Sequence, residues 1–179
     1  MGKNGDKWNG VFCTGTFERI LDDKQRLLLP KTVKKSLAQS ESLFLTPGQD
    51  GCLELHGDET LQIRSEEFTN SQSGNLKKAF SRLFYSQSER CQFDSQNRIR
   101  IPQRLIEWSS LTSKIIIVGV GGFWEIWNDG NWQDYCNNHK TRFDQVADAL
   151  LGIGELSGVQ TDAEKTKQTT PEERPNQPR

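Results

Sequence analysis

The sequence contains no long apolar run. A helix that spans a bilayer needs about 20 predominantly apolar residues, and no stretch of this chain approaches that length. The first ten residues are polar and lack the apolar stretch of a secretory signal. Both absences predict a cytoplasmic protein that does not partner with a membrane.

Cysteine and histidine are also scarce. The four cysteines lie 39 or more residues apart, and the two histidines are His56 and His139. Zinc sites need closely spaced pairs of Cys or His ligands, which this spacing excludes. We therefore expect no metal and no cofactor, and we expect reduced cysteines that serve packing. The cysteines are Cys13, Cys52, Cys91 and Cys136.

An excess of charge of one sign is absent as well. The net charge of -1 over 179 residues argues against a protein that coats nucleic acid without selectivity. The distribution is uneven, however. Between Phe17 and Leu37 six basic residues stand against three acidic ones, which leaves a local net charge of +3. A local basic patch is the electrostatic signature of a DNA-binding surface, so this segment is a candidate site.

What the sequence does contain is an internal repeat. Leu21–Pro30 aligns with Phe93–Pro102 at an offset of 72, so that the Asp, Arg and Pro of an Asp-x-x-x-Arg-x-x-x-Pro motif coincide. Apolar positions stay apolar with one exception, where Leu28 is replaced by Arg100. Farther on, the residues from Gly51 recur at an offset of 71. Two motifs in the same order indicate a duplicated unit.

Both copies predict the same elements. A short strand ends at Leu21 or Phe93, a polar turn follows, and a second strand comes next. Proline then ends that strand and suits the first turn of a short helix, where its missing N–H costs nothing. A hairpin of two strands follows the short helix. The predicted second strands, short helices and hairpin strands are Arg26–Leu29, Pro30–Leu37, Ser42–Leu45 and Cys52–His56 in copy one, and Arg98–Ile101, Pro102–Ser109, Lys114–Val118 and Phe123–Trp127 in copy two.

Longer helices are predicted after each hairpin. One begins near Asp58, and a second over Asn75–Tyr85 links the copies. The spacing of four apolar residues predicts that the linking helix buries one face, formed by Leu76, Phe80, Leu83 and Phe84. After copy two, one long amphipathic helix is expected from Trp132 to near Gly152, and a polar tail follows that is expected to be disordered. The predicted domains are a flexible extension at 1–10, a first unit at 11–70, a linking helix at 71–86, a second unit with a C-terminal helix at 87–150, and a disordered tail at 151–179.

The two copies resemble the MraZ family, bacterial regulators built from tandem AbrB-like (swapped-hairpin) units. The likeness covers roughly residues 12–149, and the segments that carry it are Phe17–Pro30, Gly51–Leu53, Phe93–Pro102, Val118–Gly121 and Glu125–Trp127. The resemblance implies a β-rich α+β fold of two swapped-hairpin β-barrel units with short and linking helices. It also implies a repressor of the operon for cell division and cell-wall synthesis. Such a repressor binds short promoter repeats in double-stranded DNA as a ring-shaped homo-oligomer at the nucleoid.

The resemblance also implies which residues bind DNA. By motif position, Arg26 is the leading contact, Lys24 lies beside it, and Arg98 takes the same position in copy two. Arg19 and Lys31, from the same basic segment, are further candidates. Arginine suits this role because its planar fork can bind guanine or clasp phosphate. The helix lysines of copy one have no counterparts in copy two, which suggests that copy one faces DNA more directly.

The sequence departs from the family pattern just before each arginine. The family usually has Gly there, whereas this chain has Gln25 and Asn97. A glycine at that point suggests a backbone conformation with positive φ, which Asn tolerates better than Gln. Either the turn of copy one has a different shape, or Gln25 bears a cost of about 1 kcal/mol.

The motif also has roles that do not involve DNA. Arg26 and Arg98 could simply pair with Asp22 and Asp94, and the sequence leaves that role open. Acid–base chemistry by Asp22 and Asp23 is disfavoured, because no histidine or nucleophile belongs to the repeat. We find no signature of an enzyme and expect no catalysis.

Two other classes of protein remain as alternatives. One is an AbrB-like antitoxin or partner-binding module, in which the C-terminal tail would bind the partner. The other, less favoured, is a β-barrel enzyme or ligand binder with an aromatic pocket around Trp124 and Trp127. The glycines from Gly119 to Gly122 do not form a phosphate loop, because a strand follows them and not a helix.

Overall fold

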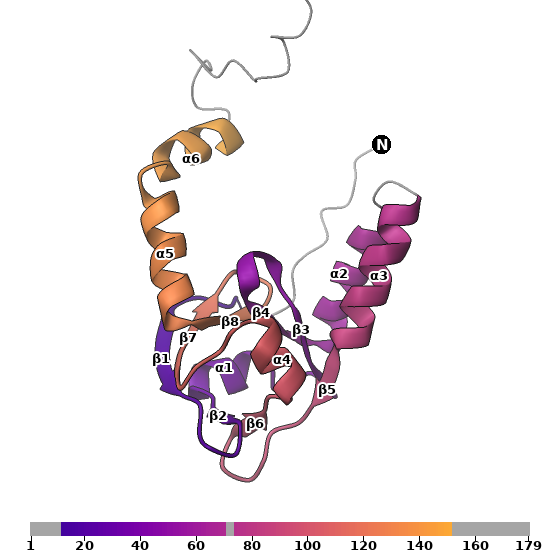
Figure 1. The fold of residues 1–179 in the computed structure, drawn as a ribbon, viewed down its shortest axis with the longest axis vertical. Coiled ribbons are helices and arrows are strands. Elements are labelled where there is room, and N and C mark those ends of the chain that lie inside the picture. The colour runs from indigo at the N-terminus through magenta and orange to yellow at the C-terminus, as the bar shows by residue number, and fades with distance from the viewer. Residues whose placement is uncertain (1–11, 71–73, 152–179) are drawn as a thin grey trace, which may run out of the picture. The chain divides into compact units, whose positions relative to one another are not determined.

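A computed structural model describes residues 12–70 and 74–151 of the chain (Figure 1). The described residues divide into two units, one up to residue 137 and one from residue 138, each of which is described by itself. The expected extension at 1–10 lies outside the described residues, as does the expected tail at 151–179 except for Leu151. No helix of the described part is long and apolar enough to cross a membrane.

The first unit is built on one six-stranded antiparallel sheet, which both copies of the repeat share. Its edge strands are β1, from copy one, and β5, from copy two. A one-turn 3-10 helix, Gln49–Gly51, connects the hairpin strands of copy one. In order across the sheet, the strands are β1 (Thr16–Ile20), β7 (Lys114–Gly119), β8 (Trp124–Asn128), β4 (Leu53–Gly57), β3 (Leu43–Pro47) and β5 (Glu89–Cys91).

The two copies exchange strands across this sheet. Strand β1 of copy one pairs with β7 of copy two, and β5 of copy two pairs in return with β3 of copy one. The equivalent strands β4 and β8 pair with each other at the centre. This exchange is the arrangement that swapped-hairpin units imply, and it confirms a β-rich α+β fold. The fold differs from the expected β-barrel units in one respect: β1 and β5 do not pair with each other, so the sheet is open and does not close into a barrel.

A second, two-stranded sheet joins the repeat motifs. Strand β2 (Arg26–Leu28) pairs antiparallel with β6 (Arg98–Arg100), and we call this pair the ribbon. Leu27 and Ile99 lie opposite each other and are fully buried. They pack into the main core with inward-facing residues of the large sheet. That core also includes Leu45, Leu53, Leu55, Ile101, Leu105, Ile115, Ile117, Trp124 and Ile126.

The short helices follow the ribbon strands as predicted. Helix α1 covers Lys31–Ser36 and α4 covers Gln103–Trp108, each one residue shorter at both ends than the sequence predicted. Pro30 and Pro102 keep extended backbone and cap the helices from outside. Each helix buries one residue in the main core, Val33 or Leu105, since a helix of two turns can turn only a narrow face inward.

A helical hairpin links the copies. Helices α2 (Asp58–Asn70) and α3 (Asn75–Gln87) lie side by side in Figure 1. The prediction that α3 buries four apolar residues is wrong for three of them. Phe84 is buried, whereas Leu76, Phe80 and Leu83 are 88%, 43% and 56% exposed. The ring of Phe80 packs on Phe84 and on Phe68 of α2. Phe80 and Leu83 also line an open hollow beside Trp108, which leaves them partly exposed.

The C-terminal helix is not continuous, so that prediction is also wrong. Helix α5 covers Asp129–Lys140, and a separate helix α6 covers Phe143–Leu151. Near its start, α5 packs Trp132 and Tyr135 against Trp127 on the outer face of the sheet. From Asn137 to Lys140 every residue of α5 is exposed. Phe143, in the second unit, is 70% exposed.

Candidate nucleic-acid interface

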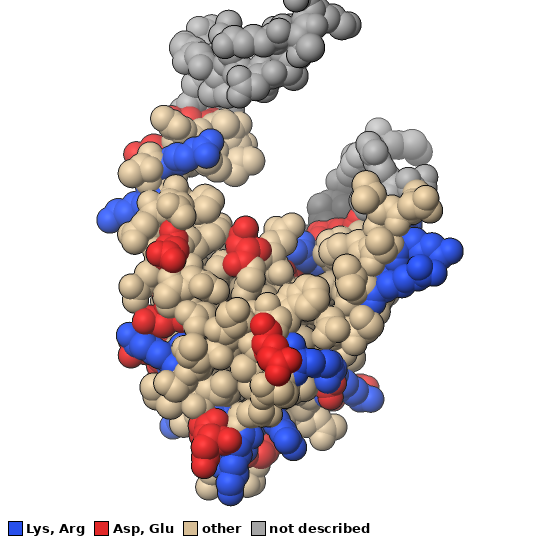
Figure 2. Space-filling model, viewed as in Figure 1, with Lys and Arg blue, Asp and Glu red and all other residues tan. Residues whose placement is uncertain are grey.

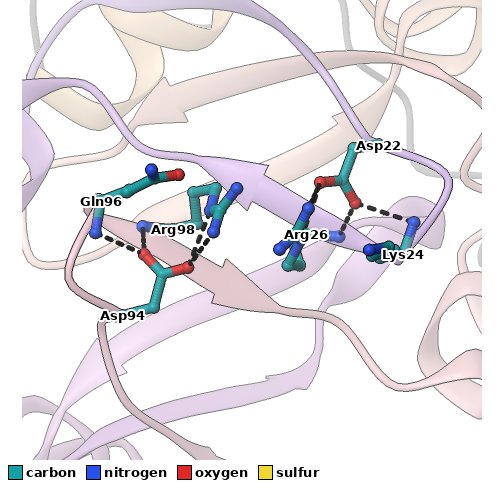
Figure 3. Close-up of polar contacts among 6 residues, drawn as sticks. All are labelled: Asp22, Lys24, Arg26, Asp94, Gln96 and Arg98. Carbon is teal, nitrogen blue, oxygen red and sulfur yellow. Dashed lines mark hydrogen bonds and ion pairs between the residues drawn. The ribbon is translucent and has the colours of Figure 1, made fainter.

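The turn before β2 is closed by Asp22. Its Oδ1 accepts hydrogen bonds from the backbone N–H groups of Lys24 (2.9 Å) and Arg26 (2.8 Å). Its Oδ2 accepts from Nε of Arg26 (2.8 Å) and lies 2.7 Å from Nη2 of the same guanidinium (Figure 3). The side chain of Arg26 lowers the pKa of Asp22 by this hydrogen bond. One carboxylate therefore shapes the turn and holds the direction of the arginine, as the alternative of an internal pair anticipated.

The turn before β6 has the same construction. Oδ1 of Asp94 accepts from the backbone N–H groups of Gln96 (2.8 Å) and Arg98 (2.9 Å). Oδ2 accepts from Nε of Arg98 and lies near Nη2, both at 2.7 Å. The pKa of Asp94 is lowered, first by the backbone hydrogen bond from Arg98. Figure 3 shows the two Asp–Arg pairs on neighbouring strands of the ribbon.

The residues that replace the family glycine adopt the backbone that glycine favours. Gln25 has φ 60° and Asn97 has φ 62°. The two turns therefore have the same backbone shape at this position, and Gln25 bears the conformational cost. The positive φ directs the backbone carbonyl of each of these residues toward the other copy. The carbonyl of Gln25 accepts from the N–H of Ile101 (2.9 Å), and that of Asn97 accepts from the N–H of Leu29 (3.1 Å).

Three of the five predicted DNA-binding residues come together at the ribbon. Arg26 and Arg98 lie on its outer face, and Lys24 is exposed in the first turn. Arg19 lies on β1, where its guanidinium donates to the carbonyl of Glu18 and lies over the ring of Phe17. Lys31 is exposed at the start of α1, and neither Arg19 nor Lys31 lines the hollows beside the ribbon.

The sequence prediction missed basic residues of copy two. Arg100 lies directly opposite Arg26 in the ribbon, and it lines a hollow of about 470 Å³ together with Lys24 and Arg26. A second hollow of about 480 Å³ on its other side includes Arg90 and Arg104. Figure 2 shows acidic and basic side chains close together at the end of the first unit where the ribbon lies. The signal was present, since Arg100 is the one position at which the repeat replaces an apolar residue by a charged one.

The aromatic pocket that the enzyme or ligand-binder alternative requires around Trp124 and Trp127 does not form. The two side chains lie on opposite faces of β8, with Trp124 in the main core and Trp127 in the smaller cluster on the other face. Both are buried, and Nε1 of Trp124 donates to the hydroxyl of Ser36 at 2.8 Å. Strand residues three apart point to opposite faces, so they cannot line one pocket.

Among residues 12–70 and 74–151, no group of three or more His, Cys, Asp or Glu side chains is placed to hold a metal ion. The four cysteines are thiols, and Cys13, Cys52 and Cys91 are buried. Burial raises the pKa of Cys91 to about 12. These thiols are part of the packing, as the scattered spacing predicted.

Comparison with known proteins points to one family. The chain is 32% identical over 141 residues to the transcriptional regulator MraZ of Alkaliphilus oremlandii (strain OhILAs), with 78% of this chain and 97% of that protein aligned. It is 33% identical over 141 residues to the transcriptional regulator MraZ of Ligilactobacillus salivarius (strain UCC118), with 76% and 95% aligned. The transcriptional regulator MraZ of Carboxydothermus hydrogenoformans (strain ATCC BAA-161 / DSM 6008 / Z-2901) is 30% identical over 142 residues, again with 76% and 95% aligned. A family model for MraZ protein, described as antitoxin-like, matches residues 84–153.

Proposed function

The chain belongs to the MraZ family of transcriptional regulators, and from this membership we propose that it binds promoter DNA through the outer face of the β2–β6 ribbon. One observation carries the proposal. Two arginines at equivalent motif positions, Arg26 and Arg98, stand on adjacent strands, each aimed by its own aspartate. Two-stranded ribbons fit the major groove of DNA, where base edges can be distinguished.

The Asp–Arg pairs suit recognition because they fix the arginines before binding. Nε and Nη2 of Arg26 contact Asp22, while Nη1 has no hydrogen bond or ion pair within the described residues. A side chain that is already ordered loses less entropy on binding. We assign Arg26 the leading contact with a base edge, with Arg98 in the same role from copy two. Lys24, Arg19 and Lys31 are proposed contacts with flanking phosphates.

Assembly is the second part of the proposal. A chain with net charge -1 binds DNA weakly through a single ribbon, whereas a ring-shaped homo-oligomer presents several ribbons to repeated promoter sites. The exposed face of α3, formed by Leu76, Phe80 and Leu83, is a candidate for burial between copies. The regulated genes are proposed to be the division and cell-wall cluster, with the protein acting as a repressor at the nucleoid in the cytoplasm.

The proposal is tested by a gel shift with a duplex from the promoter upstream of the chain's own gene. We expect wild type to bind, and Arg26→Ala to lose most of the affinity while light scattering shows the same oligomer. Arg82→Ala removes an exposed arginine on α3 and serves as the control for net charge. Unchanged binding by Arg26→Ala would remove the role given to that residue. Failure of wild type to bind any promoter duplex would overturn the DNA-binding function.

A partner-binding role is the second candidate function. The antitoxin-like description of the family model and the exposed apolar residues of α3 favour it. The two functions differ in what Leu83→Glu should do. If the α3 face serves assembly alone, this variant gives smaller oligomers with no other binding partner lost. If it holds a different protein, the oligomer persists and that protein no longer copurifies.

A further inference from the structure

The outer face of the ribbon is asymmetric, although the two motifs that form it are equivalent. Arg26 faces Arg100, and Leu28 faces Arg98. Leu28 and Arg100 occupy the same position in the two copies, so the repeat has placed an apolar residue on one side and a cation on the other. Leu28 is 49% exposed, and Arg100 is exposed too.

Arg26 and Arg100 are close because of the hydrogen-bond pattern around them. The N–H of Ile101 donates to the carbonyl of Gln25, which makes Arg26 and Arg100 a non-hydrogen-bonded pair of the antiparallel ladder. Side chains approach most closely at such pairs, and like charges placed opposite each other are destabilising. At Arg26 the carboxylate of Asp22 offsets this repulsion, so the charge left to be balanced at this point of the ribbon is that of Arg100.

The two arginines differ in how their charge is balanced. Arg26 is paired with Asp22 at 2.7 Å. Within residues 12–70 and 74–151, the guanidinium of Arg100 has no ion pair and no hydrogen bond. A solvated cation held beside a second cation favours an anion that contacts both.

Arg100 lines two hollows in which basic residues outnumber acidic ones, which also favours an anion there. On one side, the hollow formed with Lys24 and Arg26 has Asp23 as its one acidic lining residue. On the other side, the hollow with Arg90 and Arg104 has Glu89 as its one acidic lining residue, and Glu89 is already paired with Arg104. Each hollow thus has three basic lining residues and one acidic one. Arg100 is the basic residue that the two share.

We propose that Arg100 binds a phosphate of the DNA backbone beside the bases that Arg26 contacts, so that copy two supplies a backbone contact that copy one, with Leu28 at the equivalent position, lacks. The inference rests on the proposed DNA-binding function. Arg26 is held in one direction by Asp22, which suits a base edge, whereas Arg100 is free to turn toward whichever phosphate oxygen is nearest. The bound phosphate also supplies the counter-charge that Asp22 supplies to Arg26.

The test compares Arg100→Gln with Arg82→Gln, which removes the same charge from an exposed site on α3. Each is titrated with the promoter duplex and with an unrelated duplex of equal length, over a range of salt concentrations. For Arg100→Gln we expect affinity to fall about fivefold for each engaged ribbon at about 0.15 M salt, equally for both duplexes. The slope of log K against log salt should become shallower by about 0.9 per engaged ribbon. Arg82→Gln should change neither.

Two further variants, which keep or add a positive charge, distinguish a lost phosphate contact from a folding defect. Arg100→Lys keeps the charge and should retain the salt slope. Leu28→Arg builds the missing cation into copy one and should steepen the slope by about 0.9 per engaged ribbon. An unchanged slope and affinity in Arg100→Gln would overturn the inference, as would a loss confined to the promoter duplex, since that loss would show base contact. If wild type binds neither duplex, the proposed function itself fails.

Discussion

The backbone carbonyl of Gln25 accepts a hydrogen bond from the N–H of Ile101 at 2.9 Å. Gln25 has φ 60°, which directs that carbonyl toward copy two. The equivalent bond from Leu29 to Asn97 completes a reciprocal pair at the two ends of the ribbon. The positive-φ residue of each turn therefore joins the copies by a backbone hydrogen bond, so the position before the motif arginine contributes to the packing of the two copies.

Substitution by glycine measures this strain. Gln25→Gly should stabilise the protein by about 0.5–1 kcal/mol, because glycine adopts positive φ freely and this gain exceeds its larger entropy loss on folding. Asn97→Gly should change the free energy of unfolding by about zero, since Asn already tolerates that region. Urea unfolding monitored by circular dichroism gives both values.

Gln96→Gly is the control for the preceding prediction. Gln96 lies in the second turn without positive φ, so glycine there only adds freedom to the unfolded chain and should destabilise by about 0.5 kcal/mol. If Gln25→Gly were also destabilising, the strain assigned to Gln25 would be wrong, and the side-chain contact between Gln25 and Gln103 would be the more important interaction.

The Asp22–Arg26 pair predicts a pH dependence of stability. The hydrogen bond from Arg26 lowers the pKa of Asp22 below its ordinary value of 3.8. A carboxyl with a depressed pKa in the folded state contributes stability that is full above its unfolded pKa and is lost as pH falls through the folded one. Asp22→Asn should therefore melt below wild type by a constant interval from about pH 5 to 8. The interval should shrink below about pH 4. A difference that persists unchanged at pH 2 would show that the ionised carboxylate is not what stabilises the turn.

Glu125 should show the opposite dependence. It lies directly opposite Glu54 in the central strand pair, and burial, opposed by a hydrogen bond from Trp127, raises its pKa above 4.5. A carboxyl with a raised folded pKa contributes stability below its unfolded pKa that is lost as pH rises through the folded value. Glu125→Gln should therefore melt above wild type at pH 7–8 and equal to it near pH 4. Glu41→Gln removes the same charge from an exposed site and is the matched control, which should not melt above wild type at pH 7–8.

The strands and short helices could be predicted within one or two residues because their signals are local. The turn residues at Asp22 and Asp94, the prolines after the ribbon and the alternation along β6 each act over a few positions. The periodicity could not predict which faces find a partner. Helix α3 has four apolar residues at helical spacing, yet only Phe84 is buried, because burial depends on what packs over each residue in three dimensions.

The candidate site was predicted in part for a similar reason. The motif identified Arg26 and Arg98, since a repeated pattern marks equivalent positions. Arg100 was visible in the sequence as the exception to the repeat, but its importance depends on the register that places it opposite Arg26. Register between strands 72 residues apart follows from tertiary pairing, which no local pattern reports.

Close packing at Gly119 provides a last test of the fold. A Cβ atom at this position would lie 2.4 Å from the backbone nitrogen of Thr14 and 2.5 Å from the carbonyl carbon of Cys13. The segment cannot simply move away, because Cys13 and Gly121 exchange two backbone hydrogen bonds of 2.8 Å. Gly119→Ala should therefore destabilise by about 1–3 kcal/mol.

Gly130→Ala is the matched control for Gly119→Ala. Gly130 lies at the start of α5, where the added methyl group meets only the side-chain oxygen of Asn128 at 3.3 Å. Alanine favours helix by about 1 kcal/mol over glycine, so this variant should be as stable as wild type or more so. The melting temperatures of Gly119→Ala, Gly130→Ala and wild type, measured in one buffer, test both expectations. Equal stability of Gly119→Ala and wild type would mean that Cys13 and Thr14 do not lie against the end of β7.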